Sequence, residues 1–411
     1  MAIVKPFPCV RPDPGYAHQV AALPYDVYSR KEACEVTAAN HRSFLNIDRP
    51  ETQFSDDVDT YDDRVYEKAG EMLKNWIKDG IFQTDPLEAY YIYELTMDGR
   101  RQTGIVACSS IDDYVNGVIK KHENTREEKE VDRIRHVDTT DAQTGPIFLA
   151  YRTNEGINGI VNSVTNTEPL YDFVAEDGVG HRVWQIHEGD KISQIQNAFV
   201  GIPSTYIADG HHRAASAVKV GLKRRRENPG YTGEEPFNYF LSVLFPDDQL
   251  MIMPYNRVVK DLNGLSEEEF LHKIRQSFEA ACMGTEAFAP LEKGTFGMYL
   301  NRKWYCLKAS NTLKSSDPVK GLDVSILQDN LLGPVLGIKD PRTDQRMDFI
   351  GGIRGLKELE KRCSQDMAVA FSMYPTSIEE LFSVADAGLL MPPKSTWFEP
   401  KLRSGLFIHL L

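Results

Sequence analysis

The spacing of apolar residues changes abruptly at Asp209, near the middle of the chain. Thr205 to Ala208 form a short run typical of a buried strand, and Asp209-Gly210 is a turn signal. Apolar residues between Ala214 and Val218 then recur at helical spacing, and Gly221 is expected to end that helix. The pattern therefore predicts a strand that passes directly into a helix at Asp209-Gly210-His211-His212-Arg213.

Elsewhere the pattern predicts alternating strands and helices. Ser29 and Glu32 form a capping box for a helix to about Ala39, and a long amphipathic helix is expected over 57–79. Strands 89–95 and 102–109 flank the hairpin signal Asp98-Gly99. The other expected elements are strands at 43–47 and 147–151, hairpins over 239–254 and 294–309, and capped helices from Ser266 to about Ala281 and from Ser377 to Asp386.

These elements predict an α+β fold, with a mixed sheet and helices around the Asp209 turn and an additional hairpin-rich α+β portion. We expect an N-terminal α/β segment over 1–85, a central α+β core over 86–245, and a C-terminal α+β portion over 246–411. At 411 residues the chain can bury a large core.

Composition narrows the class of protein. The hydrophobic fraction is 41% and the charged fraction 26%, which is ordinary for a globular chain. No apolar run approaches the roughly 20 residues that span a bilayer, and the N-terminus has no secretory pattern. The six cysteines lie far apart, which suits reduced thiols rather than a zinc site or disulfides. We therefore expect a cytoplasmic protein without a membrane partner.

The charge balance argues against nucleic acid as a partner. Lys plus Arg is 47 and Asp plus Glu is 60, so the net charge is −13. Nucleic-acid affinity depends on neutralising phosphates, which an acidic chain does poorly. The short basic run Lys223 to Arg226 is interpreted as a solvated helix end.

The predicted strand-to-helix turn carries candidate chemistry. Free N–H groups at a helix start favour an anion, Gly210 permits close approach of a phosphate, and Arg213 adds a fork of donors. Asp209 can hold Mg²⁺ or accept a proton, and His211 and His212 follow it after Gly210. The alternative is that Asp209 caps the helix and the histidines are ordinary neighbours.

A second candidate anion site begins at Lys121. Lys121, His122 and Arg126 are expected to converge on a helix start, with Glu123 between them. Thr125 and Glu128 form a capping box, and Arg133 and His136 follow Arg126 on one helix face. The alternative is a solvated helix held by ion pairs.

Two further segments carry polar residues in binding positions. Asp26 lies between an apolar segment and a helix start, where binding loops gather, although it can equally be a turn aspartate. Near the end of the chain, Lys394, Ser395 and Thr396 form a polar loop that resembles a ligand lid. The alternative there is a terminal turn that packs Trp397 and Phe398 onto the body.

Two family resemblances add to these expectations. The pentapeptide Asp209 to Arg213 resembles the signature of free serine kinases with a ParB/sulfiredoxin-like fold, which phosphorylate L-serine and use an acidic general base. That resemblance implies a ParB/sulfiredoxin-like core and gives the base role to Asp26. The whole chain resembles the DUF1015 family, a resemblance carried by residues 22–27, 43–51, 122–126 and 392–401.

The leading hypothesis is a small-molecule phosphotransferase, with free L-serine as acceptor and ADP, ATP or pyrophosphate as donor. Such chemistry needs cations around the phosphoryl oxygens, Mg²⁺ and a base near the acceptor hydroxyl. No Walker-type or kinase-type glycine loop is present. Run in reverse, the site would dephosphorylate O-phosphoserine.

Three other functions were weighed. A ParB-like nuclease or DNA-binding protein is disfavoured by the charge, and a sulfiredoxin-type reductase needs a cysteine near Asp209, which the chain lacks. A non-catalytic ligand-binding or regulatory protein stays open, and binding without turnover would distinguish it from the enzyme. The oligomeric state cannot be predicted from the sequence.

Overall fold

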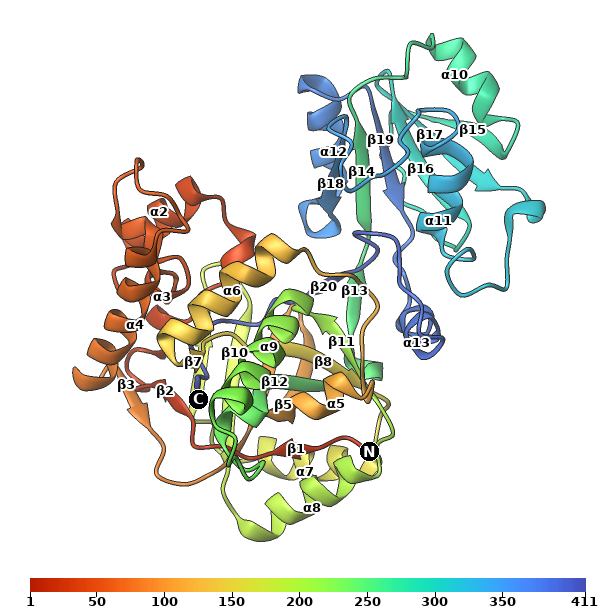
Figure 1. Cartoon of the computed structure of the whole chain (residues 1–411). Helices are drawn as coiled ribbons and strands as arrows, with labels where there is room; N and C mark the ends of the chain where they lie inside the picture. Colours follow the sequence, from red (N-terminus) through yellow and green to blue (C-terminus); the bar gives the residue numbers. More distant parts are fainter. The chain divides into compact units, whose positions relative to one another are not determined.

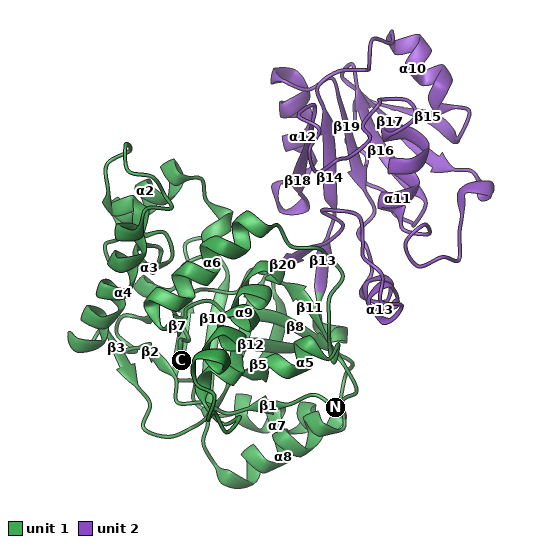
Figure 2. Cartoon of the chain, in the orientation of Figure 1, with its two compact units in different colours: residues 1–250, 400–411 green, residues 251–399 purple.

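The computed structural model describes residues 1–411, and Figure 1 shows the course of the chain. The chain forms two compact units (Figure 2). Unit 1 comprises residues 1–250 and 400–411, and unit 2 comprises residues 251–399. Unit 2 is thus inserted into the sequence of unit 1. The three segments expected from the sequence, 1–85, 86–245 and 246–411, stay a prediction about domains.

Unit 1 is built on a nine-stranded mixed sheet of order β6-β11-β8-β12-β5-β4-β10-β9, with β1 beside β5. Most neighbours are antiparallel, but β11 runs parallel to β6 and β12 runs parallel to β8. The strands are β1 (Val4–Lys5), β4 (Tyr90–Met97), β5 (Arg100–Ser110), β6 (Ile119–Lys120), β8 (Ile147–Tyr151), β9 (Tyr171–Val174), β10 (Gly180–Ile186), β11 (Thr205–Asp209) and β12 (Tyr239–Pro246). The sheet confirms the expected mixed α+β class.

Helices and short ladders complete unit 1. The helices are α1 (Ala17–Val20), α2 (Arg30–Ala39), α3 (Leu45–Asp48), α4 (Asp63–Lys78), α5 (Ile111–Val115), α6 (Glu127–Thr140), α7 (Glu155–Thr165), α8 (Gly189–Val200) and α9 (His211–Glu227). Short 3₁₀ turns lie at Tyr25–Val27, Pro50–Gln53, Pro236–Asn238 and Asp247–Gln249. The ladders pair β2 (Val10–Pro12) with β3 (Phe82–Thr84), and β7 (Ala142–Gln143) with β21 (His409–Leu410).

The core of unit 1 has two buried clusters. One lies on the sheet and includes Trp184, Phe199 and Phe240. The other joins the N-terminal helices and includes Phe44 and Trp76. Helix α6 packs against both α4 and α9, so it connects the N-terminal helices to the strand-to-helix turn (Figure 1).

Unit 2 contains a six-stranded antiparallel sheet of order β15-β17-β16-β19-β14-β18 and a two-stranded ladder of β13 with β20. Its strands are β13 (Met251–Met253), β14 (Tyr255–Val259), β15 (Phe278–Gly284), β16 (Thr295–Leu300), β17 (Lys303–Ala309), β18 (Met347–Gly351), β19 (Val369–Met373) and β20 (Trp397–Glu399). Its helices are α10 (Glu267–Ile274), α11 (Asp323–Leu327), which continues into a π-turn over Gln328–Leu332, α12 (Gly355–Gln365) and α13 (Ile378–Asp386). Short 3₁₀ turns lie at Asn311–Leu313 and Gly352–Arg354. No helix of either unit has the length and apolarity needed to cross a membrane.

Local sequence signals predicted several elements correctly. Reciprocal capping boxes start α2, α10 and α13 at Ser29, Ser266 and Ser377. Both hairpin turns have positive φ at their two central residues, 51° and 78° at Asp98-Gly99 and 47° and 60° at Asn301-Arg302. These φ values are those of the tight turns that match strand twist.

Other expected elements were wrong. Residues 43–47 lead into the short helix α3 instead of a strand, and the buried amide of Asn46 donates to the carbonyls of Ser43 and His41. Strands β12 and β13 belong to different sheets, so 239–254 is not a hairpin. Helix α10 ends at Ile274, and 278–284 is strand β15.

Gly221 does not end α9, which continues to Glu227. A Cβ at Gly221 would lie 2.3 Å from the carbonyl oxygen of Phe237. The glycine is therefore needed for close packing inside the helix, not for a helix stop.

Candidate functional site

The strand-to-helix turn forms as the sequence predicts. Strand β11 ends at Asp209 and α9 begins at His211, with Gly210 between them at φ 91°. This left-handed conformation favours glycine. A Cβ at Gly210 would also lie 3.1 Å from Nε and from a terminal nitrogen of Arg213. Glycine thus allows the Arg213 guanidinium to fold back over the turn.

The two candidate anion segments meet, although about 80 residues separate them. Strand β6 pairs in parallel with β11, with Ile119 opposite Thr205. The segments that follow therefore lie together: the N–H of Arg126 donates to Nε2 of His212 at 3.0 Å. The rings of His122 and His211 pack edge to face with centroids 4.5 Å apart.

The expected capping box of Thr125 and Glu128 does not form. Helix α6 begins at Glu127, and its N-cap residue, Arg126, supplies no side-chain cap. The Thr125 hydroxyl instead donates to Glu130, which also pairs with Lys219 of α9. A contact between helices has therefore replaced the local cap that the sequence suggested.

Two of the candidate histidines are neutral. Burial lowers the pKa of His122 to about 4 and the pKa of His211 well below its ordinary value. Neither ring nitrogen of His122 has a hydrogen-bond partner, nor does Nε2 of His211. These rings therefore add no positive charge to the site at neutral pH.

The positive charge beside the turn comes from Arg213 and Lys401. A terminal nitrogen of Arg213 donates to the carbonyl of Pro146 at 2.6 Å, and the other lies 3.5 Å from Oδ2 of Asp209. Nζ of Lys401 lies 3.6 Å from the same carboxylate oxygen. Lys401 was not among the expected site residues, although it ends the stretch 392–401.

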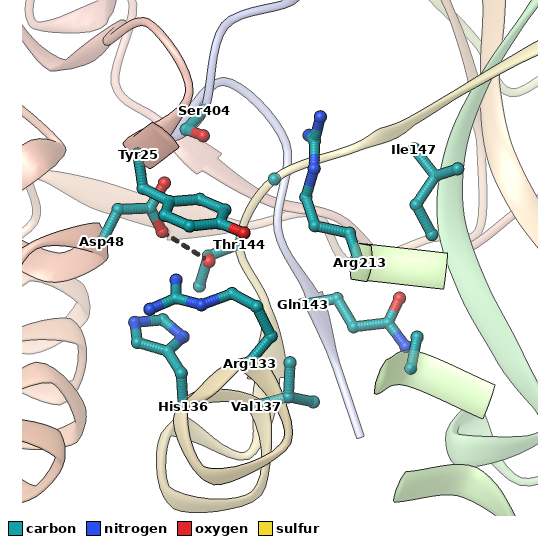
Figure 3. Close-up of a pocket in the computed structure, with 12 residues that line it drawn as sticks. Tyr25, Asp48, Arg133, His136, Val137, Gln143, Thr144, Ile147, Arg213 and Ser404 are labelled. Atoms are coloured by element: carbon teal, nitrogen blue, oxygen red, sulfur yellow. Dashed lines mark hydrogen bonds between the residues drawn. The ribbon is translucent and has the colours of Figure 1, made fainter. Parts of the chain in front are cut away.

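A pocket opens beside this turn in unit 1 (Figure 3). Its volume is about 30 Å³, within about 440 Å³ of space free of atoms that includes open solvent. The lining includes Arg133 and His136 of α6 and Arg213 of α9, which were expected from the sequence. Other lining residues come from the N-terminal and C-terminal segments. The lining residues include Tyr25, Asp48, Arg133, His136, Gln143, Thr144, Gly145, Ile147, Arg213 and Ser404.

Arg133 is the buried cation of this pocket. Its guanidinium lies 4.0 Å from the centroid of the Tyr25 ring, and its Nε donates to Asp132 at 2.8 Å. No protein group accepts a hydrogen bond from its two terminal nitrogens. Burial acts to lower the pKa of Arg133, but nearby acids, Asp132 most strongly, raise it above its ordinary value. The guanidinium is therefore always charged.

Asp48 supplies a buried acid in the same pocket. It accepts a hydrogen bond of 2.8 Å from the Thr144 hydroxyl, which holds one carboxylate oxygen (Figure 3). His136 donates from Nε2 to the carbonyl of Ile47 at 2.9 Å. Burial and the charge of Arg133 lower the pKa of His136, so its ring is neutral. The pocket therefore presents both signs of charge.

Sequence reasoning missed Tyr25, Asp48, Thr144 and Ser404 as pocket residues. Tyr25 and Asp48 fall within the stretches 22–27 and 43–51, so a signal for them was present. Thr144 and Ser404 carried no signal, because only the fold brings them to the pocket.

The remaining expected residues lie in different settings. Asp26 is exposed on the 3₁₀ turn Tyr25–Val27, one residue from the pocket lining. Lys121 is exposed, Glu123 is half-buried, and the exposed Arg126 lies 3.6 Å from Glu128.

The loop of Lys394, Ser395 and Thr396 belongs to unit 2. Nζ of Lys394 lies 5.6 Å from the centroid of the Tyr255 ring, and its carbonyl accepts from Arg257 at 3.0 Å. The buried Ser395 hydroxyl donates to the carbonyl of Pro392 at 2.6 Å. Its role as a lid stays a prediction. No group of three or more His, Cys, Asp or Glu side chains is arranged to hold a metal ion.

Comparison with known proteins identifies a family and distant structural relatives. The model of the family described as "Protein of unknown function (DUF1015)" matches residues 4–325. No curated protein matches the chain. Among solved structures, SbnI with a C-terminal truncation from Staphylococcus aureus is 12% identical, with a TM-score of 0.41 over 74% of this chain and 87% of that one.

Two further solved structures are similar at the same level. A free serine kinase in complex with AMP is 16% identical, with a TM-score of 0.36 over 74% of this chain and 92% of that one. A conserved hypothetical protein from Pyrococcus furiosus is 15% identical, with a TM-score of 0.35 over 75% and 95%. Similarities this low do not assign a function.

Proposed function

The chain belongs to the DUF1015 family, and we propose that unit 1 is a small-molecule phosphotransferase that acts on a free hydroxy amino acid, with L-serine as the expected acceptor. The observation that carries this proposal is the shared pocket lining of Arg133, Arg213 and Asp48. Two fixed cations and one buried acid match the charged groups of a phosphorylated amino acid, which has a phosphate, a carboxylate and an ammonium group.

The phosphoryl group would bind at the start of α9. N–H groups at this end have no partner within the helix, and Gly210 leaves the backbone accessible. Arg213 is held by Pro146 and Asp209, so it is positioned before a ligand arrives. Lys401 adds a second cation on Asp209. Fixed charges of this kind stabilise the charge that develops on a transferring phosphoryl group.

The amino-acid end would bind between Arg133 and Asp48. The unpaired terminal nitrogens of Arg133 suit a carboxylate, and the Tyr25 ring fixes the guanidinium plane. One oxygen of Asp48 is used by Thr144, which leaves the other for an ammonium group. With the carboxylate and the ammonium group bound in this way, the hydroxyl of serine would point toward the phosphoryl site.

The acceptor hydroxyl must lose its proton during transfer. Its oxygen would form the new P–O bond while the P–O bond to the leaving group breaks, and the leaving group would keep the electron pair of the broken bond. Asp26 is the expected base, because it stands next to Tyr25 at the pocket edge. Asp209 is the alternative. His211 and His212 hold the turn and the facing segment in place.

Magnesium fits this site with one protein ligand. Mg²⁺ commonly uses one or two carboxylates and takes its other ligands from water and phosphate oxygens. Asp209 would supply that carboxylate, since it ends strand β11 directly beside the turn. Bound there, the ion would neutralise phosphoryl oxygens of the donor, which would be ADP, ATP or pyrophosphate.

Purified protein incubated with L-serine, Mg²⁺ and each donor in separate reactions tests the proposal, with O-phosphoserine followed by ³¹P NMR. The reverse reaction starts from O-phosphoserine. Formation of O-phosphoserine with at least one donor supports the enzyme. Tight binding of serine and donor without turnover would instead indicate a ligand-binding protein.

A further inference from the structure

Unit 2 has a pocket of its own, separate from the site of unit 1. It has a volume of about 170 Å³ and lies where β14 begins and where β18 and β19 end. Most of its wall is apolar, formed by Pro254, Ala289, Pro290 and Met373. The phosphotransferase proposed for unit 1 does not use this pocket.

The start of α12 supplies hydrogen-bond donors to the pocket. Gly355 and Leu356, the first two residues of this 11-residue helix, line it. The N-cap residue, Arg354, supplies no side-chain cap. The N–H of Gly355 donates to the carbonyl of Gly352, so the donors left for a ligand are those of the residues that follow it in the first turn. The dipole at this end favours a negatively charged group.

Asn256 adds a second, independent donor. Its side chain lines the pocket, and the residue is only 2% exposed. Oδ1 accepts a hydrogen bond of 3.0 Å from the N–H of Met373, which fixes the orientation of the amide. The structure gives Nδ2 no hydrogen bond to a protein acceptor. A buried amide of this kind needs an acceptor, which a ligand would provide.

The chemistry of the pocket selects the ligand. The Ser372 hydroxyl already donates to the carbonyl of Phe288 at 2.9 Å, so the donors left in the pocket are Nδ2 of Asn256 and the first turn of α12. No acidic side chain lines it, so an ammonium group has no partner there. We propose that this pocket binds a short aliphatic monocarboxylate, with the carboxylate on Asn256 and the start of α12 and the aliphatic tail against the prolines and Met373.

Saturation-transfer NMR and calorimetry of the full chain with butyrate test this assignment. Butyrate should bind, while L-alanine and inorganic phosphate should compete at least tenfold less well. Asn256→Asp keeps the acceptor for Met373 but replaces the donor with a negative charge, and it should weaken butyrate binding at least tenfold. Ala289→Trp, at an exposed position of the pocket wall, should block binding without disturbing a core.

Two controls separate this pocket from other sites. Asn311→Asp makes the same change at an exposed position of unit 2 and should leave binding intact. Arg133→Ala removes the cation of the unit 1 pocket and should also leave it intact. The proposal is overturned if butyrate does not bind, if Arg133→Ala abolishes binding, if phosphate binds better, or if Asn256→Asp and Ala289→Trp both bind butyrate normally.

Discussion

The N–H of Arg126 donates a hydrogen bond of 3.0 Å to Nε2 of His212, which lies 86 residues later in the chain. Because Nε2 accepts, the proton of the neutral ring is on Nδ1. The contact fixes the segment 121–126 to the first turn of α9, close to where β6 and β11 run parallel. His212 is therefore a positioning residue for the two candidate anion segments.

Replacing His212 tests this positioning. His212→Ala should increase amide exchange across 121–126 about fivefold, because one hydrogen bond contributes about 1 kcal/mol. His212→Gln should restore protection, since its amide oxygen can accept from Arg126. Hydrogen–deuterium exchange of this peptide gives the readout. Equal exchange in the two variants would show that the contact does not hold the segment.

Arg213 should be required for phosphotransfer. Arg213→Ala should lower turnover about a hundredfold or more, the scale of one lost preorganised electrostatic contact. The variant should still fold, because no core is emptied. Arg226→Ala, near the end of the same helix, is the matched control and should keep normal turnover. Near-normal activity in Arg213→Ala would reduce the turn to a structural role.

His211→Ala should also lower turnover about a hundredfold, through loss of the order of the turn rather than loss of charge. The His211 ring packs on His122 and is neutral, so it holds the start of α9 in place. A pH–rate profile distinguishes the two roles. A profile in the variant that loses an inflection present in the wild type would show that His211 titrates during the reaction, against its buried setting.

Acid should destabilise unit 1 through His122. Its pKa is about 4 in the fold and about 6.5 when unfolded, so the unfolded chain binds the proton more readily. The stability that neutral His122 contributes is fully present above about pH 6.5 and is lost as the pH falls toward about 4. Between pH 7.5 and 4.5, the free energy of unfolding of His122→Leu should therefore fall by roughly 2 to 3 kcal/mol less than that of wild type. Urea unfolding measures this difference, and His187→Leu, at an exposed site, should behave like wild type.

Two acids should separate proton transfer from metal binding. Asp26→Asn should abolish serine phosphorylation and leave donor binding largely intact, because a base and a phosphate site are separate roles. Asp209→Asn should instead raise the Mg²⁺ concentration needed for activity. Magnesium titrations and donor-binding calorimetry compare the two. An unchanged rate in Asp26→Asn would move the base to Asp209, Glu123 or a histidine.

Local signals predicted the geometry of the turn better than the pocket around it. Gly210, the start of α9 and the capping box at Ser29 could be predicted because each depends on neighbouring residues. The meeting of Arg126 with His212 depends on the pairing of β6 with β11, which joins segments about 80 residues apart. Asp48 and Lys401 lie in stretches that carry the family resemblance, but their partners could not be predicted, because the contacts with Thr144 and Asp209 join residues far apart in the chain.

The helix signals at Thr125 and Gly221 failed for the same reason. Thr125 had a suitable partner for a cap, but Glu130 offered a hydrogen bond that also joins Lys219 of α9. Gly221 had the composition of a helix stop, but the carbonyl of Phe237 requires a residue without a side chain there. Packing between elements outweighed local preference at both positions.

The central claim is that one pocket of unit 1 recognises all three charged groups of a phosphorylated hydroxy amino acid. Calorimetry with O-phosphoserine tests this claim most directly. O-phosphoethanolamine, which lacks the carboxylate, and 3-phosphoglycerate, which lacks the ammonium group, should each bind at least tenfold more weakly, about 1.4 kcal/mol. Arg133→Ala should remove the first preference and Asp48→Asn the second. Equal affinity of wild type for the three compounds, or no binding of O-phosphoserine, would contradict the account.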